Sequence, residues 1–506
     1  MAALRPRPAA RSRPDGWPRP DALPAPGVRP WRELPGAPPA PWVLLWLALL
    51  GALPGCGEGA DAAARSKGTP VVLVVVDTLR ADRLSHAGHG RETAAGLDDF
   101  LAEATFFERC WAPSPWTTPS TASILTGLHP LRHGATGHGR SLPPEATTLA
   151  ERFSDAGWHT AAFSHNQNAS AVLGFDQGFD LFEAHKGKST AYDDVSLLVR
   201  RTRRWLDDER SDPFFVWLQP MNVHGPYKVP EPRRAELLGR APARGFTYYG
   251  STMRAILKEG DVARRERVSA AMLTSLEEQY DSAVRYTLDQ VSEVFADLRA
   301  RGLYDRALIV LTSDHGEELF EHGGFSHGYS LHRELLSVPL YVKLPGQRHG
   351  ARVSQDVSLT DVTPTIMEVV GQPLSAQDAD GRSLLPLIRA AWGAGDAPAP
   401  SAQPSELLFH VDWWKRCMGA ALQRGRWKLV RIERNYEGLE HVVRLYDIEA
   451  DPGETEDVAA AHPELVAELT RRLDAAVSRH RSRALQAGDD VLSQMDRQAL
   501  EQLGYL

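Results

Sequence analysis

The sequence predicts an α/β fold: a doubly wound, mostly parallel sheet followed by a smaller C-terminal α+β domain. Three observations lead to this prediction. Continuous, largely β-branched runs such as residues 70–76 and 308–313 are typical of strands that are buried on both faces of a parallel sheet. Segments with helical periodicity alternate with these strands. A stretch rich in Ala, Gly and Pro near residues 391–404 then indicates a linker, with shorter strands beyond it.

The individual elements follow from the same patterns in chain order. Apolar runs bounded by polar turns predict strands at 70–76, 160–164, 214–218, 308–313 and 338–344. Apolar residues at helical spacing predict helices at 148–156, 195–209 and 270–301. Beyond the linker we expect strands at 407–411, 426–433 and 442–448, and an amphipathic helix at 463–481.

Composition narrows the class of protein. The chain has 506 residues, long enough for a large α/β enzyme with an accessory piece, and its formal net charge is −8. It therefore lacks the basic excess of a protein held to nucleic acid by phosphate contacts. Three Cys are too few for a disulfide scaffold, whereas 18 His offer metal ligands and proton carriers.

The first 55 residues carry a targeting pattern. Residues 1–40 are rich in Arg, Pro and Ala, and residues 42–53 are apolar but too few to span a bilayer permanently. The apolar run ends in Leu53-Pro54-Gly55-Cys56, which resembles a bacterial lipobox and implies a lipid on the Cys56 sulfur. We therefore expect an exported chain, lipid-anchored in the bacterial cell envelope. A plain cleaved signal or a buried hairpin is the alternative.

Candidate metal ligands follow two of the predicted strands. Asp77 comes directly after the first strand, and Asp314 and His315 follow the strand at 308–313. Because ligands bind beyond the carboxyl ends of parallel strands, we expect these side chains to share one crevice. Two carboxylates and an imidazole suit a divalent cation. A helix cap is the alternative role for a lone Asp here. Further acids and imidazoles lie close behind: Glu317, Glu318, Glu321, His322 and His327.

Residues 116–127 read as a loop that enters a helix and ends at Gly127. Backbone N–H groups and the helix dipole favour an anion at such a helix start. The Thr117 hydroxyl, placed there, suits attack on a phosphorus or sulfur centre, with an ordinary cap as the alternative. Two further turns follow predicted strands and carry Asn166, Asn222 and His224, for which structural roles in surface loops are the alternative.

Together these segments resemble the sulfatase branch of the alkaline phosphatase superfamily. The resemblance covers about Thr69 to Arg481 and rests on several segments in the family's order: residues 75–80, 117–127, 224–227, 311–317, 327–332, 337–342, 361–365, 380–384, 427–430 and 445–457. It implies a metal-dependent ester hydrolase on the α/β fold predicted above.

The sequence departs from the sulfatase pattern at the nucleophile. Sulfatases carry Cys or Ser there, converted to formylglycine within Cys/Ser-x-Pro-x-Arg, whereas this chain has Thr117, with Thr121 in place of the Arg. Thr78 replaces the second Asp after the first strand, and Asn222 stands where related sequences often have Asp. His327 falls where the pattern tends to place an active-site Lys.

Thr nucleophiles occur in the superfamily among phosphodiesterases and among membrane phosphoglycerol and phosphoethanolamine transferases. The resemblance to them implies one divalent metal ion (Ca, Mn, Mg or Zn) and a nucleophile that acts without formylglycine. The metal ligands would be Asp77, Asp314, His315 and the hydroxyl of Thr117. His224 or His327 would protonate the leaving group, and Asn166 and Thr121 would bind substrate.

Three function classes stay open from the sequence. The first is a hydrolase of phosphate diesters, phosphonate esters or sulfate esters, acting on a small-molecule, glycan or lipid substrate. The second is an envelope transferase, and the third is a non-catalytic binding protein. The domain boundaries we predict are a leader with its signal at 1–55, a tether at 56–68, the catalytic domain at 69–390, a linker at 391–405, the C-terminal subdomain at 406–485 and a tail at 486–506.

Overall fold

The computed structural model describes residues 68–137, 139–184, 194–208, 213–239, 268–393, 406–413, 417–434 and 440–486. The chain divides into two compact units, Met1–Gly57 and Glu58–Leu506, and every described residue belongs to the second. Cys56, the targeting segment and the C-terminal tail lie outside the described residues. Among the helices that the described residues form, none is both long and apolar enough to cross a membrane.

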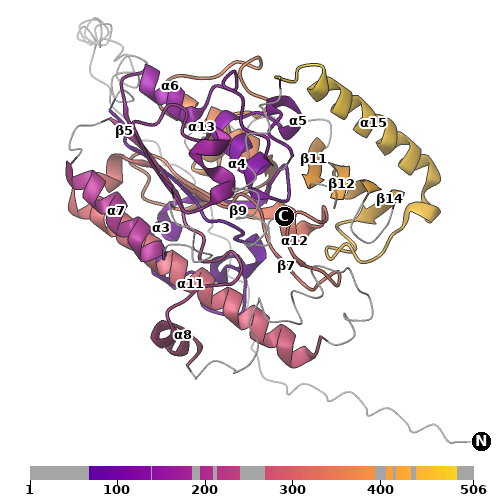
Figure 1. Ribbon diagram of the computed structural model, residues 1–506, viewed down its shortest axis with the longest axis horizontal. Coiled ribbons are helices and arrows are strands. Elements are labelled where there is room, and N and C mark those ends of the chain that lie inside the picture. Colours follow the sequence, from indigo (N-terminus) through magenta and orange to yellow (C-terminus); the bar gives the residue numbers. More distant parts are fainter. Residues whose placement is uncertain are drawn as a thin grey trace, which may run out of the picture. The chain divides into compact units, whose positions relative to one another are not determined.

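An eight-stranded sheet forms the centre of the larger, N-terminal part of the described chain (Figure 1). Its strand order is β10-β2-β9-β6-β1-β5-β3-β4. All neighbouring pairs are parallel except those of β9, which runs antiparallel to both β2 and β6. The strands are β1 (Val71–Val75), β2 (Thr105–Trp111), β3 (His159–Ser164), β4 (Leu181–Ala184), β5 (Phe214–Gln219), β6 (Leu308–Thr312), β9 (Ser337–Lys343) and β10 (Ala351–Ser358).

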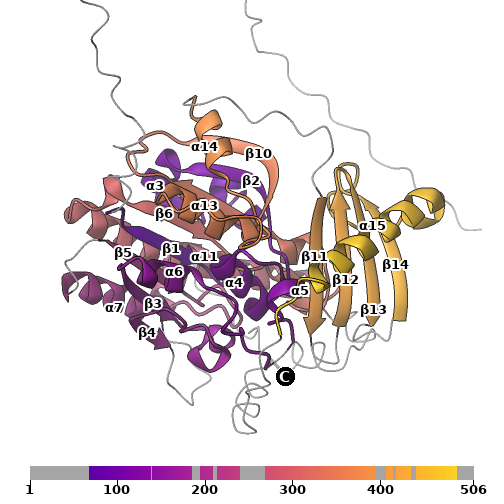
Figure 2. The same cartoon turned by 90° about the horizontal axis from the view of Figure 1, so that it is seen from above.

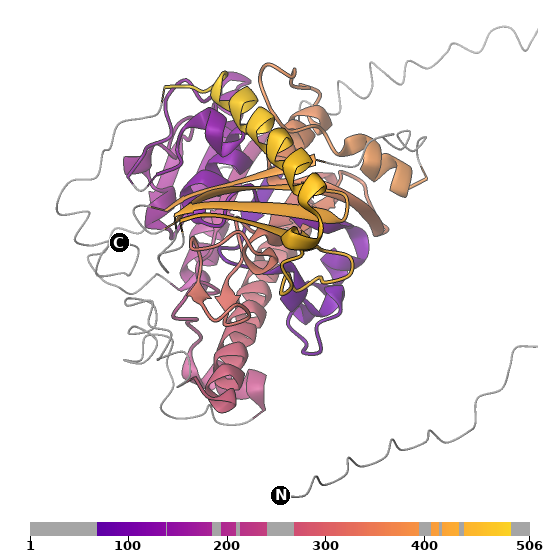
Figure 3. The ribbon, with the colours of Figure 1, turned by 90° about the vertical axis from the view of Figure 1, so that its right-hand side faces the viewer.

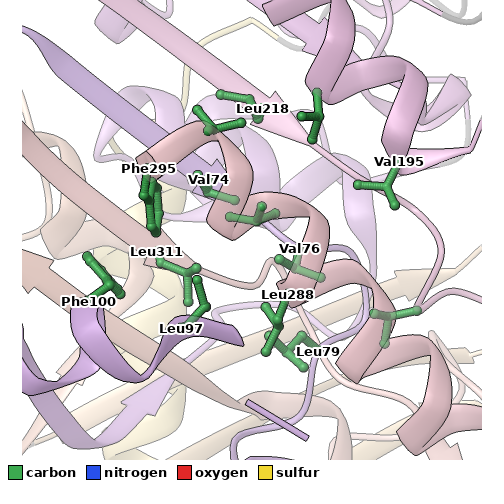
Figure 4. Close-up of a cluster of buried hydrophobic side chains, with 14 of the residues drawn as sticks. Val74, Val76, Leu79, Leu97, Phe100, Val195, Leu218, Leu288, Phe295 and Leu311 are labelled. Carbon is green, nitrogen blue, oxygen red and sulfur yellow. The ribbon is translucent and has the colours of Figure 1, made fainter. Parts of the chain in front are cut away.

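Helices cover both faces of this sheet, because side chains of successive strand residues point to opposite faces. On β1, Val72 and Val74 belong to the apolar cluster on one face. Figure 4 shows this first cluster, where Val74 and Leu311 of the strands meet helix residues such as Leu288 and Phe295. Its helices are α3 (Asp98–Glu103), α7 (Val195–Asp208) and α11 (Ala270–Ala300).

The other face of the sheet carries a second apolar cluster. Val71, Leu73 and Val75 of β1 belong to it, so the five residues of the strand alternate between the two clusters. The helices on this face are α4 (Thr117–Thr126), α6 (Leu149–Asp155), α13 (Val362–Val369) and α14 (Leu385–Ala391). Short helices complete the domain: α5 (Pro130–His133), α8 (Glu231–Leu238) and α12 (Arg333–Leu336).

A separate four-stranded antiparallel sheet forms the C-terminal part of the described chain (Figure 2). Its strands, in order, are β11 (Glu406–Trp413), β12 (Cys417–Arg424), β13 (Trp427–Arg434) and β14 (Glu440–Asp447). Helix α15 (Pro463–Arg481) lies across one face of this sheet, as Figure 3 shows, and an apolar cluster joins the two. A further cluster joins this sheet to Trp111, Trp116 and Met221 in the part of the chain that holds the eight-stranded sheet.

The predicted fold class is confirmed, with differences in detail. The strands expected at 70–76, 214–218 and 308–313 are β1, β5 and β6. The strand expected at 338–344 is β9, which is antiparallel to its neighbours. The prediction omitted β2, β4, β10 and β12. A two-stranded hairpin, β7 (Glu318–Leu319) and β8 (Phe325–Ser326), also follows the Asp-His pair.

Candidate active site

The carboxyl ends of β1 and β6 bring Asp77 and Asp314 together. The two strands are adjacent and parallel, with Val75 paired to Thr312, so each Asp lies two residues beyond the same level of the sheet. Both side chains are fully buried. One ligand atom from each of Asp77, Asp314 and His315 lies within 4.8 Å of the others. The three side chains therefore lie close together, as expected from the sequence.

The Asp77 carboxylate has one occupied oxygen and one open oxygen. Its Oδ2 accepts hydrogen bonds from Asn166 Nδ2 and, at 3.4 Å, from Gln219 Nε2. Its Oδ1 is buried and has no hydrogen-bond partner among the described residues. Burial raises the pKa of Asp77 well above its ordinary value, and the nearby charge of Asp314 adds to the rise. A cation bound at Oδ1 would stabilise the charged form of this buried carboxylate.

Both carboxylate oxygens of Asp314 accept hydrogen bonds. Its Oδ1 accepts from the backbone N–H groups of Thr78 at 3.3 Å and His315 at 3.0 Å. Its Oδ2 accepts from Thr121 Oγ1 and from Gln219 Nε2, each at 3.4 Å. Burial raises the pKa of Asp314 too, although the His315 ring and the backbone donors act in the opposite direction.

The His315 ring presents a lone pair to the same point. Its Nδ1 lies 2.9 Å from the Gly316 carbonyl oxygen, which only accepts, so Nδ1 carries the proton and Nε2 does not. Nε2 lies 3.6 Å from Asp314 Oδ2 and 4.0 Å from Asp77 Oδ1. Burial lowers the pKa of His315 to about 3, which keeps the ring neutral, as a metal ligand must be.

Thr117 is the first residue of α4, directly after Trp116, which has an extended backbone. Its Oγ1 lies 3.3 Å from His315 Nε2 and 3.2 Å from Asn166 Nδ2. The Asn166 side chain is oriented by its Oδ1, which accepts from the Asn168 N–H at 2.7 Å, so its NH₂ group faces Thr117. The predicted helix is confirmed, but Trp116 rather than Thr117 is the residue ahead of its first turn. Thr117 lies beside the acid and imidazole cluster.

Two further His rings continue from His315. The His327 ring centre lies 4.5 Å from that of His315 and 4.9 Å from that of His224. Both side chains are buried. Burial lowers the pKa of His224 to about 4, and its Nδ1 donates to the Gly225 carbonyl at 2.8 Å. His327 Nδ1 lies 3.4 Å from the buried Glu317 carboxylate.

Three other residues that the sequence analysis named, Asn222, Thr121 and His322, make contacts of different kinds. Asn222 accepts from the Val195 N–H and donates to the Lys228 carbonyl, so it ties the turn after β5 to α7. Thr121 contacts Asp314, as described above, and its role toward substrate stays a prediction. His322 pairs with Glu334 at 3.4 Å. Sequence reasoning missed Gln219, because its place beside Asp77 depends on β5 being the neighbour of β1 in the folded sheet.

Comparison with known proteins fits this geometry. The family model named Sulfatase matches residues 69–372, more than half of the chain. The chain belongs to the sulfatase family. Arylsulfatase K from Homo sapiens is 24% identical over 469 residues, which cover 84% of this chain and 85% of the relative.

Two solved structures share the sulfatase fold of this chain. The phosphonate monoester hydrolase of Agrobacterium radiobacter has a TM-score of 0.65 at 20% identity and covers 81% of this chain and 96% of its own. BT4656, in complex with its substrate D-glucosamine-2-N,6-O-disulfate, has a TM-score of 0.66 at 18% identity. The match covers 82% of this chain and 98% of BT4656. At these identities the likeness shows the fold alone.

Members of the sulfatase family depend on a metal ion, and the residues present here fit one. Asp77 Oδ1 is a buried carboxylate oxygen without a hydrogen-bond partner among the described residues, and it faces the lone pair of His315 Nε2. A cation would relieve the repulsion between the Asp77 and Asp314 carboxylates, which lie too deep for water to screen. Oxygen and imidazole ligands of this kind serve Ca, Mn, Mg or Zn.

Proposed function

We propose that this sulfatase-family hydrolase cleaves esters that carry a single negative charge, with Thr117 as a nucleophile that forms a covalent intermediate. The observation that carries the proposal is the position of Thr117 Oγ1, within 3.3 Å of both His315 Nε2 and Asn166 Nδ2 at the start of a helix. That helix start favours a bound anion. The proposed substrates are phosphate diesters, phosphonate monoesters and, with lower preference, sulfate esters.

Asp77, Asp314 and His315, joined by the Thr117 hydroxyl, would hold one divalent cation. When bound, this ion supplies positive charge that lowers the pKa of the hydroxyl and stabilises the oxygens of the transferred group. Asn166 acts in the same direction, because its N–H bond to Thr117 Oγ1 is stronger when that oxygen is an alkoxide than when it is a hydroxyl.

The reaction then proceeds in two steps. The Thr117 hydroxyl gives its proton to water as Oγ1 forms a bond to phosphorus or sulfur, and the bond from that centre to the leaving oxygen breaks. His327, which lies beside His224 and next to the Glu317 carboxylate, donates a proton to that leaving oxygen. His224 is less suited to this role, because burial lowers its pKa to about 4 and the Gly225 carbonyl holds its Nδ1 proton. Water next attacks the same centre and releases Thr117. A threonine has one hydroxyl, so its adduct depends on this second attack, and that requirement favours phosphorus esters over sulfate esters.

The charges around Thr117 support a monoanionic substrate. In the described part of the chain, the hydrogen-bond and ion-pair partners of Thr117, Asp77 and Asp314 include no Lys or Arg side chain. A phosphate monoester carries two negative charges near neutral pH, so we expect a site that holds one divalent cation and no such Lys or Arg contact to bind it less well than a monoanionic ester. Diesters, phosphonate monoesters and sulfate esters carry one.

Substitution of Thr117 tests the proposal. Purified protein is assayed with Mn²⁺, Ca²⁺, Mg²⁺ or Zn²⁺ against a bis-aryl phosphate, an aryl phosphonate monoester and an aryl sulfate. We expect Thr117→Ala to lose about 10³-fold or more in kcat/KM. Thr118→Ala is the matched control, because the Thr118 hydroxyl donates to the Asn168 carbonyl at 2.7 Å instead of facing the carboxylates. Equal activity of Thr117→Ala and the parent would exclude this nucleophile.

The same assay separates the other classes of function. An envelope transferase of phosphoglycerol or phosphoethanolamine type would pass the group from Thr117 to an alcohol acceptor, so added glycerol would divert product from hydrolysis. A non-catalytic binding protein would cleave none of the three esters with any of the metals. Attachment to the cell envelope through a lipid on Cys56 is part of the proposal and is tested separately, by mass spectrometry of the mature N-terminus.

A further inference from the structure

Gln219 occupies the space between the two carboxylates of the site. It is the last residue of β5 and is fully buried. Because β5 is the parallel neighbour of β1, its carboxyl end lies beside Asp77. The two hydrogens of the Gln219 amide are directed to different acceptors, Asp77 Oδ2 and Asp314 Oδ2, each 3.4 Å from Nε2.

A chain of hydrogen bonds sets the direction of this amide. The Asn166 N–H donates to Ser164 Oγ at 3.2 Å, and the Ser164 hydroxyl donates to Gln219 Oε1 at 3.4 Å. The oxygen of the amide therefore faces Ser164, and its NH₂ group faces the carboxylates. The reversed amide would place its oxygen against two carboxylates, which only accept hydrogen bonds.

We propose that Gln219 is a positioning residue, which fixes the Asp77 and Asp314 carboxylates so that they and His315 Nε2 converge on one cation. The inference rests on the proposed function, because that cation is the one assigned there. By occupying Oδ2 of Asp77, Gln219 and Asn166 leave Oδ1 as the oxygen that is open to a ligand. Residues that orient metal ligands in this way typically account for about 10- to 100-fold in metal affinity.

The test measures Mn²⁺ binding to the full chain by isothermal titration calorimetry. Gln219→Leu removes the donors and keeps a side chain of similar size. Gln347→Leu is the matched control: Gln347 is fully buried, and its amide contacts Thr105 and Leu344, at the amino end of β2 and just after the end of β9. Ser164→Ala is a milder second variant, which keeps Gln219 but removes the hydroxyl that orients it. Melting temperatures are recorded for all variants without metal.

We expect Gln219→Leu to bind Mn²⁺ about 10- to 100-fold more weakly than the parent, Ser164→Ala to fall between the two, and Gln347→Leu to bind as the parent does. A Gln219→Leu protein that is folded and binds Mn²⁺ as tightly as the parent overturns the inference and leaves the proposed function standing. A parent protein that binds no Mn²⁺, Ca²⁺, Mg²⁺ or Zn²⁺ overturns both. Should Gln219→Leu not fold, unchanged Mn²⁺ binding by Ser164→Ala overturns the inference in its place.

Discussion

Glu454 and Lys428 form a buried ion pair where the C-terminal sheet meets the catalytic domain. Lys428 Nζ lies 2.7 Å and 2.9 Å from the two carboxylate oxygens of Glu454, and His332 Nδ1 lies 3.2 Å from one of them. Burial by itself would raise the pKa of Glu454, but the Lys428 charge and the His332 hydrogen bond outweigh it and lower the pKa from 4.5 to about 2.

The pKa shift gives the size of the effect on stability. At about 1.4 kcal/mol for each unit of pKa, a drop from 4.5 to about 2 corresponds to about 3 kcal/mol. Because the pKa is lower in the folded state, this stability is fully present above pH 4.5 and is lost as the pH falls toward 2. Glu454→Gln should therefore lower the free energy of unfolding by about 3 kcal/mol at pH 7 and by progressively less in acid.

Urea unfolding between pH 7 and pH 3 measures both features. Glu456→Gln removes an exposed carboxylate from the same loop and is the control. The double variant Glu454→Gln/Lys428→Met should recover part of the loss, because it no longer leaves the Lys428 charge buried without its partner. If Glu454→Gln and the parent keep the same difference in unfolding free energy from pH 7 to pH 3, the ion pair does not act as argued.

Three further predictions concern the active site. Tyr280→Phe should lower the free energy of unfolding by about 1–3 kcal/mol and weaken Mn²⁺ binding, as urea denaturation and calorimetry will show. The reason is that the Tyr280 hydroxyl donates to the Thr78 carbonyl at 2.7 Å and so holds Thr78, next to Asp77, in a left-handed backbone conformation (φ 58°). Mn²⁺ at about 100 times its Kd should raise the free energy of unfolding by about 2.7 kcal/mol, and a chelator should reverse the rise in melting temperature. An aryl phosphate monoester should have a lower kcat/KM than the matching diester, as steady-state kinetics will show.

The central strands could be predicted because a strand that is buried on both faces has a continuous run of apolar residues. β1 and β6 are almost entirely apolar. The strands that were missed do not have such a continuous apolar run. β2 has the exposed Glu108 and Arg109 in its middle, and the apolar residues of β10 are interrupted by the polar run Ser354-Gln355-Asp356. β12 contains Gly and Ala, which are poor strand formers, and is held in place by its neighbours on both sides.

Some residues of the candidate site could also be predicted from the sequence, and others could not. Asp77, Asp314 and His315 could be predicted because ligands bind beyond the carboxyl ends of parallel strands, and two carboxylates with an imidazole at such ends suit a divalent cation. Gln219 could not be singled out, since it ends its strand without a charge, and its role depends on which strands are adjacent. That order is a property of the folded sheet. Asn222, only three residues further on, is equally polar but bonds to α7 and to its own turn.

The C-terminal sheet contacts the segment just before α4, the helix that begins with the proposed nucleophile Thr117. The His410 N–H of β11 donates to the Pro113 carbonyl at 2.9 Å, three residues before Trp116. Trp116 itself is fully buried in the cluster that includes Phe409 and Val411 of the same strand. Thr117 follows directly, so its position depends on how the C-terminal sheet packs. If Thr117 is the nucleophile, as proposed, we expect loss of the Glu454–Lys428 pair to lower activity as well as stability, because both depend on this packing.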